Sequence, residues 1–158
     1  MELAHYHGHA AGKPVIYFYK KNEPYGFLSQ FYARGFEDPD YPGLYFSTAE
    51  HHIHYNKAIL FEDNERAEEI LAVPASQPSK AYLLGQRVRG FNSEVWNKHK
   101  ERIVYEANHL KFYNPRNADI RQKLLNTKGH MLLNCAPKDS IWGLGLSLEE
   151  ARVASPLR

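Results

Sequence analysis

The sequence contains a single cysteine, Cys135, and this scarcity limits the kind of protein it encodes. One cysteine cannot form an intramolecular disulfide, so the fold does not depend on an oxidising compartment. No apolar run approaches the roughly 20 residues needed to span a bilayer. No basic segment followed by an apolar one opens the chain, so a secretory signal is not expected. We therefore expect a cytoplasmic or nuclear protein that is not secreted and has no membrane partner.

A strong excess of either charge is also missing. The chain has 20 Lys and Arg against 18 Asp and Glu, a formal net charge of +2. This balance neither requires nor excludes nucleic acid, because a local patch matters more than the sum. Aromatic residues, in contrast, make up 13% of the chain. They suit a pocket that stacks a planar ligand, with an aromatic-rich core as the simpler explanation.

The length and the apolar pattern predict one α+β domain, mainly helical and with a few short strands. We expect a flexible N-terminal lead-in over residues 1–14 and a single domain over residues 15–158. Strands are predicted at 16–19, 44–46 and 131–133. Helices are predicted to follow the cap residue Ser47, to run over 63–73, 78–84, 93–113 with Ser93 as the cap, and 117–125, and to follow Ser147, which has the spacing of a capping box with Glu150. In the helix over 93–113, a core-facing stripe is predicted from residues that repeat every seven positions: Trp96, Ile103 and Leu110.

The most informative segment runs from Ser47 to Ala58. A helix starting near Ser47 places Glu50, His54 and Lys57 roughly on one face, since seven residues are close to two turns. A carboxylate, an imidazole and an amine in an aromatic setting can protonate, orient and attack a substrate. This stripe is therefore the first candidate for a catalytic centre.

Each member of the stripe also has a structural interpretation. Ser47 and Glu50 have the spacing of a capping box. Lys57 would ordinarily be solvated, and only burial beside aromatic rings would make its neutral amine available as a nucleophile. The histidines of the segment lack the spacing of a metalloprotease helix. We therefore favour no metal and no cofactor.

A second group of candidates lies in the segment Asp139-Ser140-Ile141-Trp142-Gly143-Leu144-Gly145. Its glycines match a dinucleotide-binding loop only loosely. Asp139 could accept hydrogen bonds from ribose hydroxyls or activate water, and Trp142 could stack on a base or sugar. The alternative is an Asp that caps a turn and a Trp that packs in the core. Arg87 belongs to a basic segment that could face a phosphate or simply be solvated.

Four blocks of the sequence together resemble the NADAR domain family, also called YbiA-like. The blocks are residues 27–32, residues 49–58 with their Glu-His and Lys, residues 81–87 with Trp96 and 111–112, and residues 132–146. The resemblance covers roughly residues 15–148. Gln30, His54 and Asn134 depart from the family pattern of asparagine, glutamine and glutamate at these places. The departures bear on substrate specificity more than on the reaction class.

The resemblance implies a YbiA-like fold and an enzyme that cleaves N-glycosidic bonds to ribose. Some family members act on ribosylamino-pyrimidine intermediates of riboflavin biosynthesis, and others remove ADP-ribose from guanine in nucleic acid. We predict the second reaction, with ADP-ribosylated nucleic acid as the partner. The flavin-pathway reaction and non-catalytic binding of ADP-ribose are the alternatives. The predicted catalytic residues are Glu50, Lys57 and Asp139, and the predicted ligand-binding residues are Ser29, Phe31, His54, Arg87, Trp96, Asn134, Trp142 and Gly143.

Overall fold

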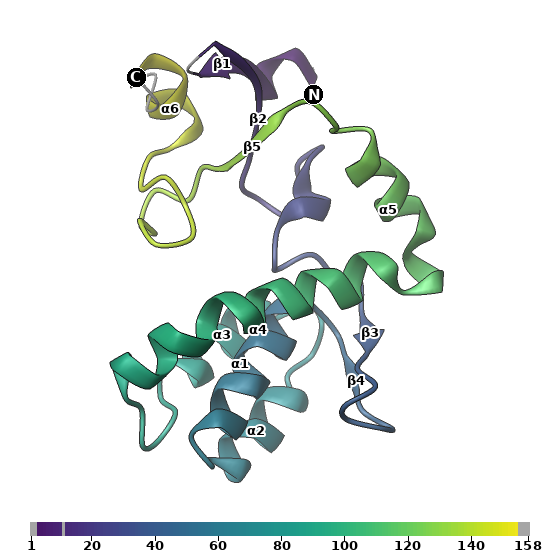
Figure 1. Cartoon of the computed structure of the whole chain (residues 1–158), viewed down its shortest axis with the longest axis vertical. Helices are drawn as coiled ribbons and strands as arrows, with labels where there is room; N and C mark the ends of the chain where they lie inside the picture. The colour runs from purple at the N-terminus through teal and green to yellow at the C-terminus, as the bar shows by residue number, and fades with distance from the viewer. Residues whose placement is uncertain (1–2, 11, 155–158) are drawn as a thin grey trace. The chain divides into compact units, whose positions relative to one another are not determined.

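The computed structural model describes residues 3–10 and 12–154 (Figure 1). The chain divides into two compact units, one formed by the residues up to Ser29 together with those from Gln122 onward, the other by Gln30–Arg121. Six α-helices and five short strands make the described residues an α+β fold dominated by helix. The predicted fold class is confirmed.

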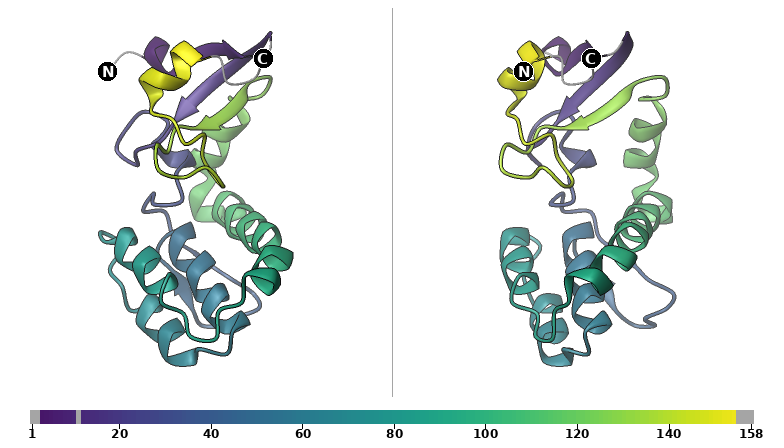
Figure 2. Two further views of the ribbon diagram at one scale, coloured as in Figure 1. Left: turned by 90° about the vertical axis from the view of Figure 1, so that its left-hand side faces the viewer. Right: turned by 60° about the vertical axis from the view of Figure 1, so that its left-hand side comes forward.

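In the unit Gln30–Arg121, helix α1 (Ala49–Leu60) is the central element. It contacts α2 (Asn64–Leu71), α3 (Pro78–Gly85) and α4 (Ser93–Tyr113), and Figure 2 shows these helices gathered around it. Strands β3 (Phe36–Glu37) and β4 (Tyr45–Phe46) form a short antiparallel pair before α1. The 3-10 turn η3 (Pro115–Asn117) leads into α5 (Ala118–Leu125).

The core of this unit is built from apolar side chains of α1, α2, α4 and the β3–β4 pair. Phe36, Phe46 and Ile70 are completely buried, and Ile103 of α4 is 1% exposed. Trp96 and Leu110, one heptad before and after Ile103, pack against the same core. The predicted core-facing stripe of α4 is therefore present. Burying each such side chain contributes roughly 2 kcal/mol.

The capping residues of two helices differ by one position from the predicted caps. The cap of α1 is Thr48, whose Oγ1 accepts from the backbone N–H of His51, and not Ser47. The cap of α4 is Asn92, whose Oδ1 accepts from the N–H of Val95, and not Ser93. Both segments hold two adjacent cap-type residues, and the residue that caps has an extended backbone in each.

The other unit contains a three-stranded sheet in the order β1-β2-β5. Strand β1 (His7–Ala10) pairs antiparallel with β2 (Lys13–Phe18), and β2 pairs parallel with β5 (Met131–Asn134). The 3-10 turns η1 (Leu3–Tyr6) and η2 (Gly26–Leu28) flank β1 and β2. η1 and β1 lie in the segment predicted to be a flexible lead-in; residues 1, 2 and 11 lie outside the described residues. Its flexibility and the single domain over 15–158 stay predictions.

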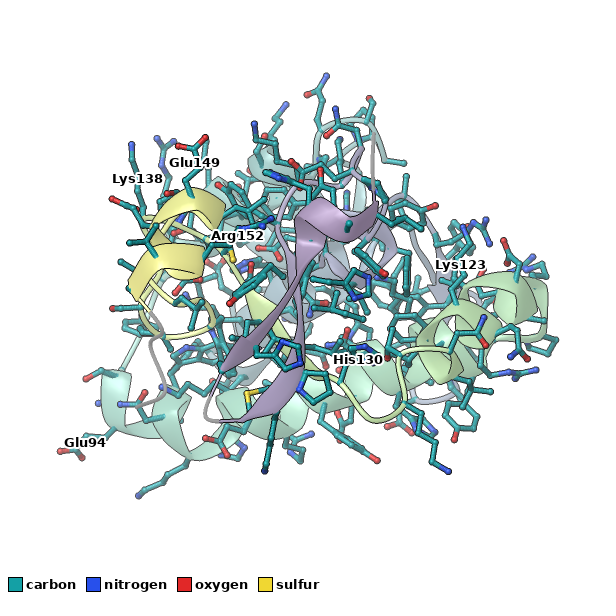
Figure 3. The ribbon with its side chains drawn as sticks, turned by 90° about the horizontal axis from the view of Figure 1, so that it is seen from above. Glu94, Lys123, His130, Lys138, Glu149 and Arg152 are labelled. Atoms are coloured by element: carbon teal, nitrogen blue, oxygen red, sulfur yellow. The ribbon has the colours of Figure 1, made fainter. Side chains whose placement is uncertain are left out.

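Helix α6 (Leu148–Ala154) belongs to the same unit. The backbone N–H of Ser147 donates to the Glu150 carboxylate at 2.8 Å, and the N–H of Glu150 donates to the Ser147 hydroxyl at 3.2 Å. The predicted capping box is confirmed. Arg152 of α6, labelled in Figure 3, donates to the backbone carbonyl of His5 and so links the helix to η1.

Over residues 3–10 and 12–154, no helix combines the length and the apolar character needed to cross a membrane.

Asp63 both caps α2 and holds the loop that precedes α4. Its Oδ1 accepts from the N–H of Arg66 at 3.3 Å and from Nη2 of Arg89 at 2.6 Å, and its Oδ2 accepts from the N–H of Arg89 at 2.8 Å. The side-chain hydrogen bonds from Arg89 are the largest cause holding the pKa of Asp63 well below its ordinary value. A carboxyl with a lowered folded-state pKa stabilises the fold above its unfolded pKa, and this contribution is lost as pH falls toward the folded value.

Replacing Asp63 by alanine is therefore expected to lower the free energy of unfolding at pH 7 by about 2 kcal/mol, since the cap and a buried acceptor are lost. The difference from wild type should shrink below about pH 4, because the unfolded carboxyl then binds a proton. Urea denaturation at pH 7 and pH 3 measures both effects. Glu65→Ala, which removes an exposed partner of Arg89, is the matched control and should change little. A pH-independent difference would contradict the prediction.

Candidate active site

The carboxylate of Glu50 is buried on α1 and paired with His54. Glu50 is 8% exposed, and its Oε1 lies 2.8 Å from Nε2 of His54, one helical turn later. The capping-box interpretation of Glu50 is wrong, because Thr48 caps the helix and Glu50 then occupies its second position and not the third. The structure thus brings a predicted catalytic residue and a predicted ligand-binding residue into direct contact.

The close approach of α3 to α1 fixes the ring of His54. A Cβ atom on Gly85, the last residue of α3, would lie 1.9 Å from Nδ1 of His54. Any side chain at this position would therefore push the imidazole away from its place. Nδ1 of His54 is buried and has no hydrogen-bond partner among the described residues, while Tyr82 meets the same ring edge-on at 5.6 Å.

Lys57 lies near the C-terminal end of α1 and is buried, 6% exposed, not solvated. Its Nζ lies 4.7 Å from the ring centroid of Phe91 and 5.2 Å from that of Trp96. Burial lowers the pKa of the amine below its ordinary value, because a desolvated ammonium is disfavoured. This is the environment in which the neutral amine of a lysine becomes available as a nucleophile.

A second buried lysine, Lys111 of α4, is completely enclosed. Its Nζ lies 5.0 Å from the ring centroid of Phe112 and 5.7 Å from that of Tyr32. Burial, with a smaller contribution from the charge of Arg34, lowers the pKa of Lys111 to about 7. Full enclosure makes Lys111 a core group, whereas Lys57 lies beside an aromatic ring that is itself 48% exposed.

Two further residues of this unit, Arg87 and Phe31, are also predicted to bind ligand. Arg87 follows α3, where its backbone N–H donates to the carbonyl of Leu84, and its side chain is exposed. Phe31 is half-buried in the segment before β3. Their predicted ligand-binding roles stay predictions.

In the other unit, the predicted residues after β5 share one loop. Oδ1 of Asp139 accepts from the backbone N–H groups of Ile141 and Trp142 at 2.9 and 3.0 Å, so Asp139 caps a turn. Nδ2 of Asn134 donates to the carbonyl of Trp142 at 3.2 Å. A Cβ on Gly143 would lie 2.8 Å from the carbonyl oxygen of Asp139, so this close approach requires glycine.

These contacts give the loop a defined shape, and the indole of Trp142 is 43% exposed on it. Ser29, also in this unit, ends η2 with its N–H donating to the carbonyl of Gly26. The catalytic role of Asp139 and the ligand-binding roles of Ser29, Asn134, Trp142 and Gly143 stay predictions.

The other histidines of α1 have structural partners. Nε2 of His51 donates to the carbonyl of Val73 at 2.9 Å, so Nδ1 of the neutral ring accepts from the hydroxyl of Thr48. Burial lowers the pKa of His51, which favours this neutral form.

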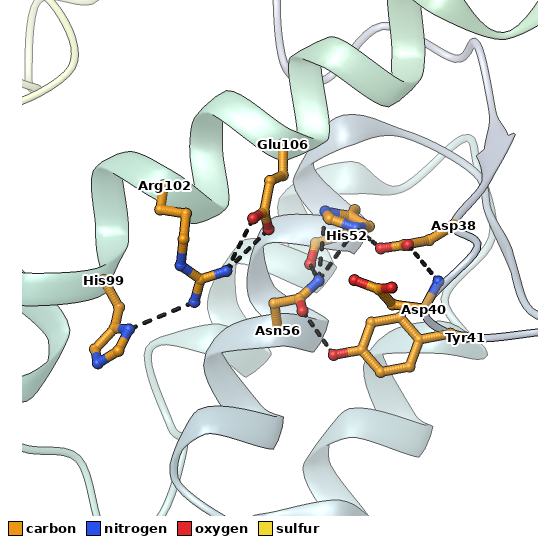
Figure 4. A network of polar contacts seen from close by, with 8 residues as sticks. All are labelled: Asp38, Asp40, Tyr41, His52, Asn56, His99, Arg102 and Glu106. Atoms are coloured by element: carbon orange, nitrogen blue, oxygen red, sulfur yellow. Dashed lines mark hydrogen bonds and ion pairs between the residues drawn. The ribbon is translucent and has the colours of Figure 1, made fainter.

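His52 is completely buried and donates from Nε2 to Oδ2 of Asp38 at 2.6 Å (Figure 4). Burial lowers the pKa of His52 and outweighs the opposing effect of the hydrogen bond that His52 donates to Asp38. Asn56 joins the network by donating to the carbonyl of His52 and accepting from the hydroxyl of Tyr41. Across the described residues, no group of three or more His, Cys, Asp or Glu is arranged to hold a metal.

Phe91 contacts the candidate catalytic residue Lys57 and is not among the residues predicted from the sequence. It lies in the loop between α3 and α4, where glycine and asparagine signal a turn but nothing signals contact with α1. The structure also has a cavity of about 380 Å³ that contains none of the predicted site residues. It is lined by Glu37, Asp38, Pro39, Pro42, Gly43, His109, Leu110, Tyr113, Asn114 and Pro115.

Gly85→Ala is expected to break the hydrogen bond between Glu50 and His54, because the new methyl group would overlap Nδ1 of His54. Overpacking of this kind typically costs about 1–3 kcal/mol of stability. Thermal unfolding and the imidazole nitrogen chemical shifts of His54 measure the two effects. Leu83→Ala, an exposed change on the same helix, is the control. Unchanged His54 shifts in Gly85→Ala would contradict the prediction.

Comparison with known proteins identifies a family and several relatives that the chain resembles. Residues 17–156 match the NADAR domain family model. The chain is 34% identical to N-glycosidase R617 of Acanthamoeba polyphaga mimivirus, over 92% of this chain and 79% of the viral protein. It is 35% identical to N-glycosidase Npun_R5314 of Nostoc punctiforme, over 83% and 80%. It is also 32% identical to the chloroplastic riboflavin biosynthesis protein PYRR of Zea mays, covering 83% of this chain but 22% of the maize protein.

The fold has a solved counterpart in the NMR structure of the E. coli protein YbiA. The TM-score is 0.68 at 26% identity, over 90% of this chain and 80% of YbiA. The two relatives named N-glycosidases support hydrolysis of an N-glycosidic bond as the enzyme class. Together with the family match over residues 17–156, these similarities show that the chain belongs to the NADAR domain family.

Proposed function

We propose that this protein is an N-glycosidic bond hydrolase that removes ADP-ribose from ADP-ribosylated guanine in nucleic acid. The observation that carries the proposal is the buried amine of Lys57 on α1, about two helical turns after Glu50 and about one turn after its partner His54. An acid with a fixed partner and an amine with a lowered pKa can together cleave a ribosyl C–N bond by general acid–base and nucleophilic catalysis.

In the proposed mechanism Glu50 acts first as a general acid–base catalyst. It moves a proton between the ribose and the departing nitrogen, and the ring oxygen leaves the anomeric carbon as the sugar opens. The hydrogen bond with His54 holds the carboxylate in one orientation, so the proton is transferred from a defined place.

Lys57 then acts as the nucleophile. Its neutral amine adds to the anomeric carbon of the opened sugar, and guanine leaves with its nitrogen protonated. The resulting Schiff base between Lys57 and ribose is hydrolysed by water, which restores the amine and releases ADP-ribose.

A second version of the mechanism uses the same residues differently. Glu50 or Asp139 would activate water against an oxocarbenium-like carbon, and Lys57 would bind a phosphate or a sugar oxygen. Borohydride reduction during turnover separates the two versions. The covalent version predicts a ribosyl adduct on the peptide containing Lys57, and its absence across a range of pH would exclude that version.

The remaining assignments extend the proposal to ligand binding. Arg87 would contact a phosphate, and Trp96 would form an aromatic wall beside Lys57. Trp142 would stack on the base or the sugar. Substituting each residue singly should weaken ADP-ribose binding.

Lys57→Ala and Glu50→Gln are each expected to lower the release of ADP-ribose from guanine-modified single-stranded DNA by at least about a hundredfold while the protein remains folded. Lys80→Ala, which removes an exposed lysine on α3, should retain full activity. Full activity of Glu50→Gln would remove Glu50 from the mechanism. No release by the wild type, with ADP-ribose binding intact, would favour a non-catalytic binding module.

The similarity to the maize riboflavin biosynthesis protein supports a second candidate, an N-glycosidase of ribosylamino-pyrimidine phosphates. The chain spans only 22% of the maize protein, so the name of that protein describes far more than the segment the two share. This candidate predicts hydrolysis of a ribosylamino-pyrimidine phosphate and no release of ADP-ribose from modified DNA or RNA. Parallel assays of the wild type on both substrates decide between them.

A further inference from the structure

The loop between α3 and α4 is held at three points. Val88 is 6% exposed and belongs to the core of the unit. Arg89 donates from its backbone N–H, Nε and Nη2 to the carboxylate of Asp63. Asn92 caps α4. Only Gly90 and Phe91 lie between the second and third points, so the backbone of Phe91 is held on both sides although its side chain is 48% exposed.

Phe91 forms one wall around the amine of Lys57. Its ring lies 4.7 Å from Nζ on one side and meets the ring of Phe61, the residue that ends α1, at 5.4 Å. Trp96 provides the second wall at 5.2 Å. Trp96 lies on helix α4, whereas the position of Phe91 is set by the loop between α3 and α4.

The anchor of that loop is the ion pair between Asp63 and Arg89. The Asp63 side chain is 1% exposed, and the Arg89 side chain lies at the surface, 63% exposed. Two nitrogen atoms of one guanidinium bind the same carboxylate, and this geometry fixes direction as well as distance. Asp63 follows α1 closely in sequence, so the ion pair links the C-terminal end of α1 to the loop that covers it.

We propose that Arg89 and Phe91 are positioning residues for Lys57: the Asp63–Arg89 ion pair holds the loop so that the Phe91 ring shields the amine from water. The inference rests on the proposed function only in giving Lys57 a catalytic role. Arg89 touches neither the amine nor, in the proposed mechanism, the substrate, and it acts through Phe91.

The direction of the effect follows from the cause of the pKa shift. Burial lowers the pKa of Lys57, and charged side chains are not among the causes. Such side chains on the helices packed against α1 include Glu65, Arg66, Lys80, Lys98 and Glu101. Removing the ring admits water to the amine, so the pKa of Lys57 should rise toward its ordinary value. Loss of the cation–π contact opposes this rise but is the smaller effect at a partly exposed site.

The test measures the reactivity of Lys57 directly. The protein is treated with trinitrobenzenesulfonate between pH 6 and pH 10, and modification at Lys57 is followed by peptide mass spectrometry. Because only the neutral amine reacts, the midpoint of the pH curve reports the pKa and the plateau reports accessibility. Phe91→Ala is expected to raise the midpoint by about one pH unit, which lowers the neutral fraction at pH 7 about tenfold. Phe91→Leu, which retains an apolar side chain, should restore part of the shift.

A double-mutant cycle tests whether Arg89 acts through Phe91. Arg89→Met is expected to shift the midpoint in the same direction as Phe91→Ala, and the double variant should shift no further than Phe91→Ala alone. Arg89→Lys keeps the positive charge but lacks the two guanidinium nitrogens that bind Asp63, so it should give an intermediate shift. It replaces Arg89→Met in the test if that variant folds poorly. Arg102→Met, which removes an exposed ion pair with Glu106 on α4, is the control and should leave the midpoint unchanged.

The outcomes separate this inference from the proposed function. Labelling needs no substrate, so a wild type that releases no ADP-ribose would overturn the proposed function and leave the labelling result interpretable. An unchanged midpoint in Phe91→Ala, or additive shifts in the double variant, would overturn the inference while leaving catalysis by Lys57 intact. With both proposals correct, ADP-ribose release at pH 7 by Phe91→Ala falls about tenfold through kcat and recovers as pH rises.

Discussion

The burial of α1 is the constraint on which the rest of its unit depends. Nine of the twelve residues of this helix are buried, and five of the nine are glutamate, histidine or lysine: Glu50, His51, His52, His54 and Lys57. A buried polar group costs free energy unless it is hydrogen-bonded, so the neighbouring segments must supply partners. The cap residue Thr48, the carbonyl of Val73 and the carboxylate of Asp38 do so for His51 and His52. The loops before α1 and after α2 are therefore specified by polar groups as well as by packing.

Lys57 differs from the other buried polar residues of α1 in the kind of neighbour it has. The histidines face oxygen atoms, whereas its amine lies beside the faces of Phe91 and Trp96. Ring faces attract a cation but replace little of its lost hydration, and the lowered pKa reflects this balance. A buried lysine that only stabilised the fold would be expected to pair with a carboxylate. The aromatic surroundings favour a reactive amine instead.

Much of the fold could be predicted because helix ends carry local signals. Asp63, Pro78 and the Ser147–Glu150 pair mark starts that the structure contains. The sequence could not show which of two adjacent cap-type residues, such as Ser47 and Thr48, caps the helix, because the backbone conformation decides this. The burial of Lys57 and the contact with Phe91 also could not be predicted, because they depend on packing between segments distant in sequence. Helical spacing predicted that Glu50 and His54 lie on one face of the helix, where they form a pair. The fit of His54 against Gly85 could not be predicted, because it depends on the contact between two helices.

Lys111 has a consequence for the thermodynamics of the whole chain. Its amine has a pKa of about 7 in the folded protein, whereas an exposed lysine in the unfolded chain has a pKa of about 10.4. Between these values the unfolded chain holds about one more proton at this residue than the folded protein does. Folding at mildly alkaline pH therefore releases a proton to the buffer, and the calorimetric enthalpy of unfolding includes the ionisation enthalpy of whichever buffer is used.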